Sequence, residues 1–250
     1  MHSSDPCGAG LTACSPDLET VSPQSARLCF LRELGRIRYS DALAIQNQLA
    51  ARRKQDEVGD HLLLLEHPHV ITVGRNGHNE NVLASPAILE RAGIEYFPTD
   101  RGGDVTYHGP GQLVGYPILD LREWKRDVGA YVRTLEQSII DTLAGYGIEA
   151  GRIPKLTGVW TDAGKIAAIG VHLSRWVTSH GFALNVTTDL SYFQYIVPCG
   201  LTKPVTSMAA LGVRTSLEEV GRRFAAHFAR NFDCEMLLEG PVLAAMEREN

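Results

Sequence analysis

Apolar side chains recur at helical spacing in two stretches of the chain. The first covers residues 127–143, where one face of a helix would carry Val128, Tyr131, Leu135, Ile139 and Leu143. The second begins at Ser216, which has capping-box spacing to Glu219. Its apolar face would carry Leu217, Val220, Phe224 and Phe228. A third helix is predicted from the N-cap candidate Ser40 through Leu49, ending near the polar run at residues 52–60.

Short apolar runs bounded by turn residues predict strands. Ordered structure is expected to begin with a run at residues 28–31, and two buried strands are separated by His67, Pro68 and His69. The predicted strands after the first run are residues 61–66, 70–73, 114–121, 158–161, 165–173 and 182–186. Strands outnumber helices and do not alternate with them regularly, which favours an α+β fold. We expect a mixed or antiparallel sheet covered by helices.

The chain divides into a short extension and one domain. Residues 1–26 are rich in Ser, Pro, Gly and Thr without periodicity, and they are predicted to be a flexible N-terminal extension. The rest, residues 27–250, shows no internal repeat and no linker, so we expect a single catalytic domain.

Composition excludes several classes of protein. Of the 250 residues 44% are hydrophobic and 21% charged, and the net charge of -5 gives no electrostatic case for a nucleic-acid partner. The first residues lack the basic and apolar segments of a signal peptide, and no apolar run approaches the ~20 residues that span a bilayer. Five scattered cysteines indicate free thiols in a reducing compartment: Cys7, Cys14, Cys29, Cys199 and Cys234. We therefore expect a cytoplasmic protein without a membrane partner.

Residues 101–112, RGGDVTYHGPGQ, are the most unusual stretch. Glycine lets the backbone approach a ligand closely, while Arg101, Tyr107 and His108 add polar groups with long reach. A tight turn before the next strand is the plainer interpretation. The glycine spacing is not a dinucleotide fingerprint, because a strand rather than a helix follows it.

Lys165 opens an apolar strand within residues 158–170. The segment resembles a phosphate-binding loop only superficially, since five residues separate Gly158 from Gly164 and Ile166 follows the lysine. A lysine at this place is usually solvated. The functional alternative is a partly desolvated amine with a lowered pKa, which suits proton transfer.

Cys199 lies between Pro198 and Gly200, so it is predicted to sit on a turn, where its thiol could be exposed. A single cysteine is nevertheless more often a small core residue than a nucleophile. His108 could act as the base of a Cys-His pair with Cys199, as an alternative to Lys165.

The other polar candidates have plainer interpretations. His67, His69 and nearby His78 lack the further ligands of a zinc set, so no metal is expected. His180 is interpreted as a loop residue or a substrate-positioning group. Tyr107 and Trp160 could be ordinary core aromatics.

Taken together, these segments resemble the lipoyl(octanoyl) transferase family over roughly residues 28–235. The resemblance rests on residues 101–112, 157–170, 180–185 and 198–200, with supporting matches at 65–68, 72–75 and 206–208. Asp104 stands at a position that varies, residues 69–71 depart from the usual apolar-aromatic run, and residues 1–26 have no counterpart.

The resemblance implies the fold of biotin and lipoate protein ligases and a Cys/Lys dyad. On the matching positions, Cys199 would be the acyl-thioester nucleophile and Lys165 the proton carrier. Three segments would line the acyl site: Arg101, Gly102, Gly103, Asp104, Val105, Thr106, Tyr107 and His108; Ala168, Ile169 and Gly170; and Gly181, Phe182 and Ala183.

The implied reaction moves an octanoyl group from octanoyl-acyl-carrier protein to a lysine of an apo lipoyl domain. Acceptors would be the lipoyl domains of 2-oxoacid dehydrogenase complexes and the glycine cleavage H protein. No cofactor is expected, because transfer from a thioester to an amide is downhill. The alternatives are an ATP-dependent lipoate or biotin ligase, a non-catalytic module that docks lipoyl domains, and a Cys-His hydrolase.

Overall fold

The computed structural model describes residues 27–197 and 204–240. Within them, eight strands form a mixed sheet in the order β11-β1-β2-β6-β10-β9-β8-β7, and three more form a small sheet in the order β4-β3-β5. The strands are β1 Arg27–Arg36, β2 Asp60–Glu66, β3 Val70–Val73, β4 Glu95–Pro98, β5 Val105–His108, β6 Gln112–Ile118, β7 Gly151–Ile153, β8 Leu156–Thr161, β9 Gly164–Ser174, β10 Val177–Asn185 and β11 Cys234–Leu238. The predicted α+β class with a mixed sheet is confirmed.

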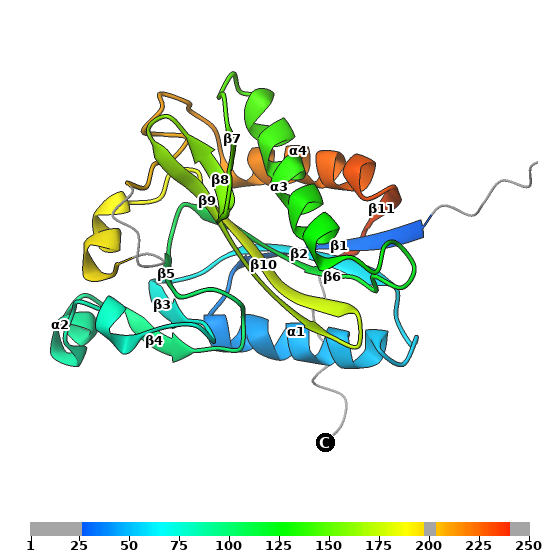
Figure 1. Ribbon diagram of the computed structural model, residues 1–250, viewed down its shortest axis with the longest axis horizontal. Helices are drawn as coiled ribbons and strands as arrows, with labels where there is room; N and C mark the ends of the chain where they lie inside the picture. Colours follow the sequence, from blue (N-terminus) through cyan, green and yellow to red (C-terminus); the bar gives the residue numbers. More distant parts are fainter. Residues whose placement is uncertain (1–26, 198–203, 241–250) are drawn as a thin grey trace, which may run out of the picture.

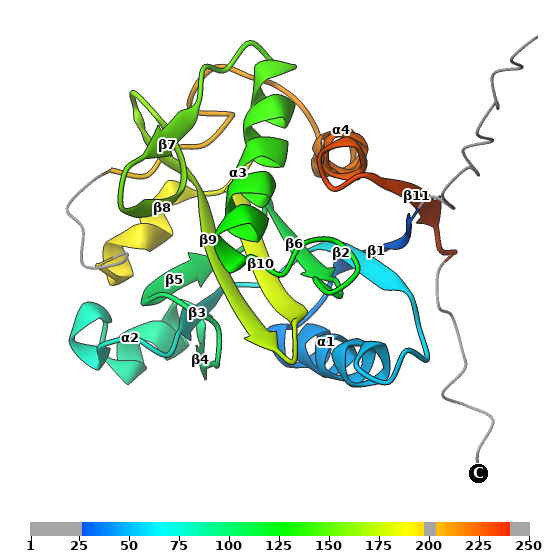
Figure 2. The same ribbon diagram turned by 45° about the vertical axis from the view of Figure 1, so that its right-hand side comes forward.

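Helices cover both faces of the large sheet (Figure 1). Helices α3 (Val128–Ala144) and α4 (Leu217–Asn231) pack on one face, and α1 (Tyr39–Arg53) packs on the other. The small sheet lies beside α1 with the short helix α2 (Pro86–Arg91), as the turned view in Figure 2 also shows. Helices α3 and α4 thereby bury the apolar faces that their sequence spacing predicts.

Capping explains where two helices begin. The Asp127 carboxylate accepts from the Ala130 N–H at 2.9 Å before α3, and the Ser216 hydroxyl accepts from the Glu219 N–H at 3.1 Å before α4. The prediction of Ser40 as an N-cap is wrong, because the N-cap is Arg38, two residues earlier, and α1 begins at Tyr39. No side chain caps this helix end, and its first residue, Tyr39, is buried at 2% exposure with its hydroxyl donating to Thr99 Oγ1 at 3.2 Å.

Strand predictions succeeded where a single apolar run made the strand, whereas β4, β5, β7 and β11 were not predicted. The predicted runs correspond to β2, β3, β6, β8, β9 and β10, although β6 ends at Ile118 rather than Leu121. Strand β5 was missed because it lies inside the glycine-rich segment that was interpreted as a turn. There it pairs antiparallel with β3. Strand β11 was also missed, and it pairs parallel with β1.

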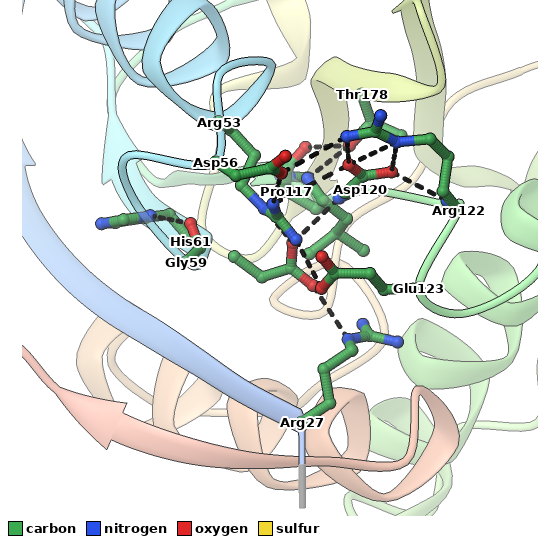
Figure 3. A network of polar contacts seen from close by, with 12 residues as sticks. Arg27, Arg53, Asp56, Gly59, His61, Pro117, Asp120, Arg122, Glu123 and Thr178 are labelled. Carbon is green, nitrogen blue, oxygen red and sulfur yellow. Dashed lines mark hydrogen bonds and ion pairs between the residues drawn. The ribbon is translucent and has the colours of Figure 1, made fainter.

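A buried charge network joins β1, α1, β2 and the segment after β6 (Figure 3). The Arg53 guanidinium donates from Nε to Asp60 Oδ1 at 3.0 Å and from Nη2 to Glu123 at 2.6 Å. Asp60 also accepts from the Asp120 N–H at 2.8 Å, and the Asp120 carboxylate receives both Nε and Nη2 of Arg122. The network thus fixes the end of α1 against the large sheet.

Candidate active site

A cavity of about 470 Å³ lies where β9 and β10 meet the glycine-rich segment before β5. Three separate segments contribute to it. Its sequence-predicted lining residues are Arg101, Gly102, Gly103, Asp104, Val105, Thr106, His108, Lys165, Ala168, Ile169, Gly170, Gly181, Phe182 and Ala183. The fold therefore brings together, around one cavity, residues that lie more than seventy positions apart in the chain.

Tyr107 is the exception among the predicted lining residues that the structure describes. Side chains alternate along β5, so Tyr107 faces away from the cavity that Thr106 and His108 line. Its ring is fully buried, and its hydroxyl is 2.7 Å from His69 Nδ1. Tyr107 is a core aromatic of the small sheet. The alternation was invisible in the sequence because this segment was not predicted to be a strand.

The cavity has a buried wall and an exposed rim. The wall includes Tyr39 from α1 and Tyr116 from β6, both of which are buried and were not predicted as site residues. Asn76, Lys155 and Thr157 lie on the rim and are exposed. The contributions of α1 and β6 depend on how the elements pack, so no local pattern in the sequence could have indicated them.

Lys165 stands at the start of β9 and lines the cavity. Its Nζ lies 5.2 Å from the centroid of the Trp160 ring, a cation–π contact on the neighbouring strand. Gly158 gives the side chain room, because a Cβ built there would lie 2.6 Å from Lys165 Cε. The backbone of Lys165 donates to Pro204 O at 2.9 Å and accepts from the Thr206 N–H at 3.0 Å.

Arg101 is a buried cation at the wall, with 7% of its surface exposed. Its Nη2 donates to the Thr72 carbonyl at 2.7 Å, and its Nε donates to Thr72 Oγ1 at 3.1 Å. These bonds hold the guanidinium against β3. Gly74 leaves the necessary space, since a Cβ there would lie 2.9 Å from Arg101 Nη1.

His108 is held on both ring nitrogens. Nδ1 lies 2.8 Å from Gln112 Oε1, and Nε2 lies 3.4 Å from Thr72 Oγ1. Burial is the main cause of a pKa well below the ordinary histidine value. Because both nitrogens already have partners, the arrangement favours a structural role over the predicted alternative role as a base.

His180 lies within β10, so its interpretation as a loop residue is wrong. It lines the buried wall at 2% exposure. Its Nε2 lies 2.8 Å from Asp100 Oδ1, and its backbone N–H donates to Gln46 Oε1 at 2.8 Å. Burial lowers the pKa of the imidazole, and the hydrogen bond and charge of Asp100 oppose this shift without cancelling it.

His67 and His69 bind other side chains rather than forming a ligand pair. His67 Nε2 lies 2.8 Å from Tyr116 Oη, whereas His69 bonds to Tyr107. In residues 27–197 and 204–240, three carboxylates lie close enough together to hold a metal ion: Asp56, Asp120 and Glu123. Those carboxylates are paired with Arg53 and Arg122. No helix in the same residues is long and apolar enough to cross a membrane.

Cys199 lies outside the described residues. The described residues on either side of it are hydrogen-bonded to the rest of the fold. Before it, Val197 donates its N–H to Asn81 O at 2.8 Å. After it, Pro204 accepts the bond from Lys165, and Val205 forms a parallel bridge with Lys165. Both flanking segments therefore bond to residues near the cavity.

Comparison with known proteins places this geometry in a family. The model described as the lipoyl protein ligase A/B catalytic domain matches residues 38–229. A curated protein named octanoyltransferase from Solibacter usitatus is 80% identical over 219 residues, which are 88% of this chain and 99% of that protein. Another of the same name from Chloroflexus aurantiacus is 53% identical over 211 residues, covering 82% and 95%.

Solved structures share the fold at low sequence identity. Lipoate-protein ligase A bound with ATP has a TM-score of 0.65 and 18% identity, covering 86% of this chain and 89% of that chain. A bipartite lipoate protein ligase from Thermoplasma acidophilum also has a TM-score of 0.65 and 18% identity, covering 86% of each chain. At this identity the likeness establishes the fold, and confirms the predicted lipoate-ligase architecture.

Proposed function

Because the chain belongs to the lipoyl protein ligase A/B catalytic domain family, we propose that it transfers an octanoyl group from octanoyl-acyl-carrier protein to a lysine of an apo lipoyl domain. It is an acyltransferase, and its reaction is octanoyl transfer in protein lipoylation. The donor, the covalent intermediate on Cys199 and the acceptor lysine are the finer parts of the proposal.

The observation that carries the proposal is the position of Lys165. Its side chain lines a cavity whose other walls come from the three motif segments. The cavity is large enough for a medium acyl chain, since ligand pockets of ~300–1,000 Å³ enclose small molecules. Phe182, Ile169 and Ala183 supply apolar surface along it.

Cys199 is two positions after Val197 and five before Pro204 in the sequence, and the structure describes both of these flanking residues. Pro204 is hydrogen-bonded to the backbone of Lys165. This supports the pairing of Cys199 with Lys165 in one site.

The two residues suit the chemistry of acyl transfer. A thiol of ordinary pKa, about 8.5, is mostly protonated at neutral pH, and a nearby ammonium favours the thiolate. The Cys199 thiolate attacks the thioester carbonyl of the donor, and Lys165 gives a proton to the departing pantetheine sulfur. The acceptor amine then attacks the acyl–Cys199 bond, and neutral Lys165 takes the proton that the amine loses. Cys199 leaves as the thiolate.

An apolar cavity selects chain length gradually. Each buried CH₂ contributes ~0.8 kcal/mol, so an eight-carbon chain is favoured with some tolerance of neighbouring lengths. Exclusion of water from the buried wall would protect the thioester from hydrolysis. The free thiols of Cys29 and Cys234 are consistent with the reducing cytoplasm in which the proposed partners would occur.

The lipoyl domains of 2-oxoacid dehydrogenase complexes and the glycine cleavage H protein are the proposed acceptors. The test is the intact mass of the protein after mixing with octanoyl-carrier protein in the absence of ATP. Wild type should gain one octanoyl group that hydroxylamine removes. Cys199→Ser should gain nothing or form an ester that resists mild hydroxylamine treatment. Adding an apo lipoyl domain should then discharge the wild-type intermediate.

A different outcome would support the ligase alternative. If wild type gains no mass, but a lipoyl domain is modified once ATP and free octanoate are added, the transferase proposal and the role of Cys199 are wrong. Release of free octanoate without any acceptor would instead indicate a hydrolase.

A further inference from the structure

Strands β8 and β9 separate along the opening of the cavity. Strand β8 pairs with β9 only as far as Val159, which lies opposite Ala167. Beyond that pair β9 continues to Ser174, and β10 is its only strand partner there in the part of the chain that the structure describes. Figure 2 shows β9 running on past the β7–β8 hairpin. Residues 155–157 on one side and 168–171 on the other line the cavity, so it opens between two strand edges.

The edge of β9 that faces this opening carries backbone polar groups. The carbonyl of Val171 accepts from the Gly102 N–H at 2.9 Å, and Gly102 lies outside the sheet, on the edge of β9 that β10 does not occupy. Backbone hydrogen-bonding groups alternate between the two edges of a strand with a period of two residues. The N–H and C=O of Ile169 therefore point to the same edge, between the last pair with β8 and the bond to Gly102. Backbone groups at such an edge bond to water or to a ligand.

Lys155 supplies a cation at the outer end of the opening. It follows Pro154 in the turn between β7 and β8, lines the cavity and is exposed. Its φ is +67°, a conformation that residues other than glycine and asparagine rarely adopt. Arg152 on β7 pairs with Glu136 at 2.9 Å, whereas Lys155 has no ion-pair partner within residues 27–197 and 204–240. The Lys155 ammonium is therefore available to an anion of a ligand.

The distance between Lys155 and Lys165 matches the length of a pantetheine arm. Lys155 lies five residues before Trp160, and Trp160 pairs with Lys165. At ~3.3 Å per residue this separation is about 16 Å along the strand. The arm of the proposed donor carries the thioester sulfur at one end, two amides along its length and a phosphate at the other end. From sulfur to phosphorus it is as long as about four extended residues, ~15 Å.

We propose that the opening between β8 and β9 binds the pantetheine arm of the donor, with the amides hydrogen-bonded to the β9 edge at Ile169 and the phosphate at Lys155. The inference rests on the proposed function, because it takes the donor to be an acyl thioester of a carrier protein. The buried wall then holds the acyl chain, and the exposed rim holds the arm. Both contacts favour the thioester donor over free octanoate, which has neither an amide nor a phosphate.

The first test compares two small donors that differ only in the phosphate, octanoyl-phosphopantetheine and octanoyl-pantetheine. Because the proposed contact with Lys155 is exposed to solvent, wild type should prefer the phosphorylated donor in kcat/KM by about 3- to 5-fold at low salt, and by less at high salt. In Lys155→Asn the preference should disappear. Asparagine removes the charge and tolerates the positive φ, so the turn should keep its conformation.

Arg175→Asn is the matched control for Lys155→Asn. Arg175 is also an exposed basic residue with a positive φ, +53°, and it lies in the turn between β9 and β10, but it does not line the cavity. This variant should keep the wild-type preference for the phosphate. If wild type shows no preference, or if Arg175→Asn loses it to the same extent as Lys155→Asn, the assignment of the phosphate to Lys155 is wrong.

The second test concerns the edge of β9. In two analogues of octanoyl-phosphopantetheine, an ester oxygen replaces the N–H of one amide or the other, so the arm keeps its length and loses one hydrogen-bond donor. A hydrogen bond of this kind corresponds to about 2- to 10-fold in binding, so at least one analogue should lose this factor in kcat/KM with the wild type. Unchanged kcat/KM for both analogues would mean that the β9 edge does not bind the arm.

Binding of an unreactive thioether separates this inference from the proposed function. In calorimetry, wild type should bind S-octyl-phosphopantetheine more tightly than S-octyl-pantetheine, whereas Lys155→Asn should not. If wild type transfers octanoyl groups but distinguishes neither the phosphate nor the amides, the arm site is wrong and the transferase proposal stands. If no acyl group is transferred yet the thioether shows the phosphate preference, the transferase proposal is wrong and the arm site stands. If ATP, rather than the thioether, loses affinity in Lys155→Asn, the rim binds a nucleotide and the inference is wrong.

Discussion

Two buried polar regions of this molecule are built on opposite principles. In the charge network, Arg53, Asp60 and Asp120 are each at most 3% exposed, and ion pairs compensate their charges (Figure 3). The cavity wall instead gathers mainly neutral rings, among them His108 and Tyr116, whose pKa values burial shifts toward the uncharged form. Paired charges fix elements to one another. Neutral polar groups can surround an apolar ligand at lower desolvation cost.

The largest expected effect is a loss of activity without a loss of stability, and it concerns the cavity. Lys165→Met should reduce octanoyl transfer by about 100- to 10,000-fold, the range for loss of a general acid–base group. The aliphatic stem is retained beside Trp160, so the urea midpoint of unfolding should stay close to that of wild type. The measurements are single-turnover transfer and urea unfolding followed by circular dichroism. Full activity in Lys165→Met would remove the cavity from the proposed mechanism.

The second effect concerns stability. Arg53→Met leaves Asp60 buried with less compensation, and breaking a buried pair in this way costs about 3–5 kcal/mol of unfolding free energy. The control is the double variant Arg53→Met with Asp60→Leu, which removes both charges. Because Asp60 Oδ2 also pairs with Arg27 Nε at 2.8 Å, the double variant should recover only part of the loss. Urea titration measures both variants. Equal losses in the two would contradict the view that an unpaired Asp60 causes the loss in Arg53→Met.

These regions also show what the sequence could and could not predict. The faces of α3 and α4 follow from spacing within one helix, and the motif residues around Lys165 follow from contiguous segments. Tyr39 and Tyr116 join the cavity only through the packing of α1 on β6 and β10.

Two local features escaped prediction for a different reason. Strand β5 lies in a glycine-rich segment whose composition favours a turn. Its hydrogen bonds to β3 stabilise the extended conformation instead. His180 adopts a positive φ in the middle of a strand, although histidine itself does not favour that conformation. In both cases tertiary contacts outweigh the local preference of the chain.

The third effect is a difference in acid sensitivity. Burial lowers the pKa of His67 to about 4, below the unfolded value of about 6.5. Protons then bind the unfolded chain first as the pH falls, so stability decreases between about pH 6.5 and 4, by up to about 3 kcal/mol for this group. His67→Gln should show a shallower decline over that window, measured by urea unfolding at several pH values. An unchanged slope would mean that folding does not lower the pKa of His67.

Asp120 of the charge network should respond in a lower pH range. Burial opposes ionisation of Asp120, but the hydrogen bonds and charge of Arg122 outweigh it and hold the pKa of the carboxyl below its usual value. Its contribution is present above the unfolded pKa of about 3.9 and is lost as the pH falls through the lower folded value. As the pH falls, His67, which bonds to Tyr116 of the wall, therefore destabilises the protein before Asp120 does.

The smallest expected effect tests whether burial, rather than the number of ion pairs, gives the network its strength. Asp56 pairs with Arg53 and Arg122, yet its side chain is 64% exposed. Exposed pairs contribute about 0–1 kcal/mol because water screens them, so Asp56→Asn, which tolerates the φ of +57° at this position, should shift the unfolding free energy by no more than this. The measurement is urea titration at low and high salt, and salt should reduce the difference in unfolding free energy between the variant and wild type. A loss as large as that of Arg53→Met would show that the network acts as one unit, in which an exposed member is as important as a buried one.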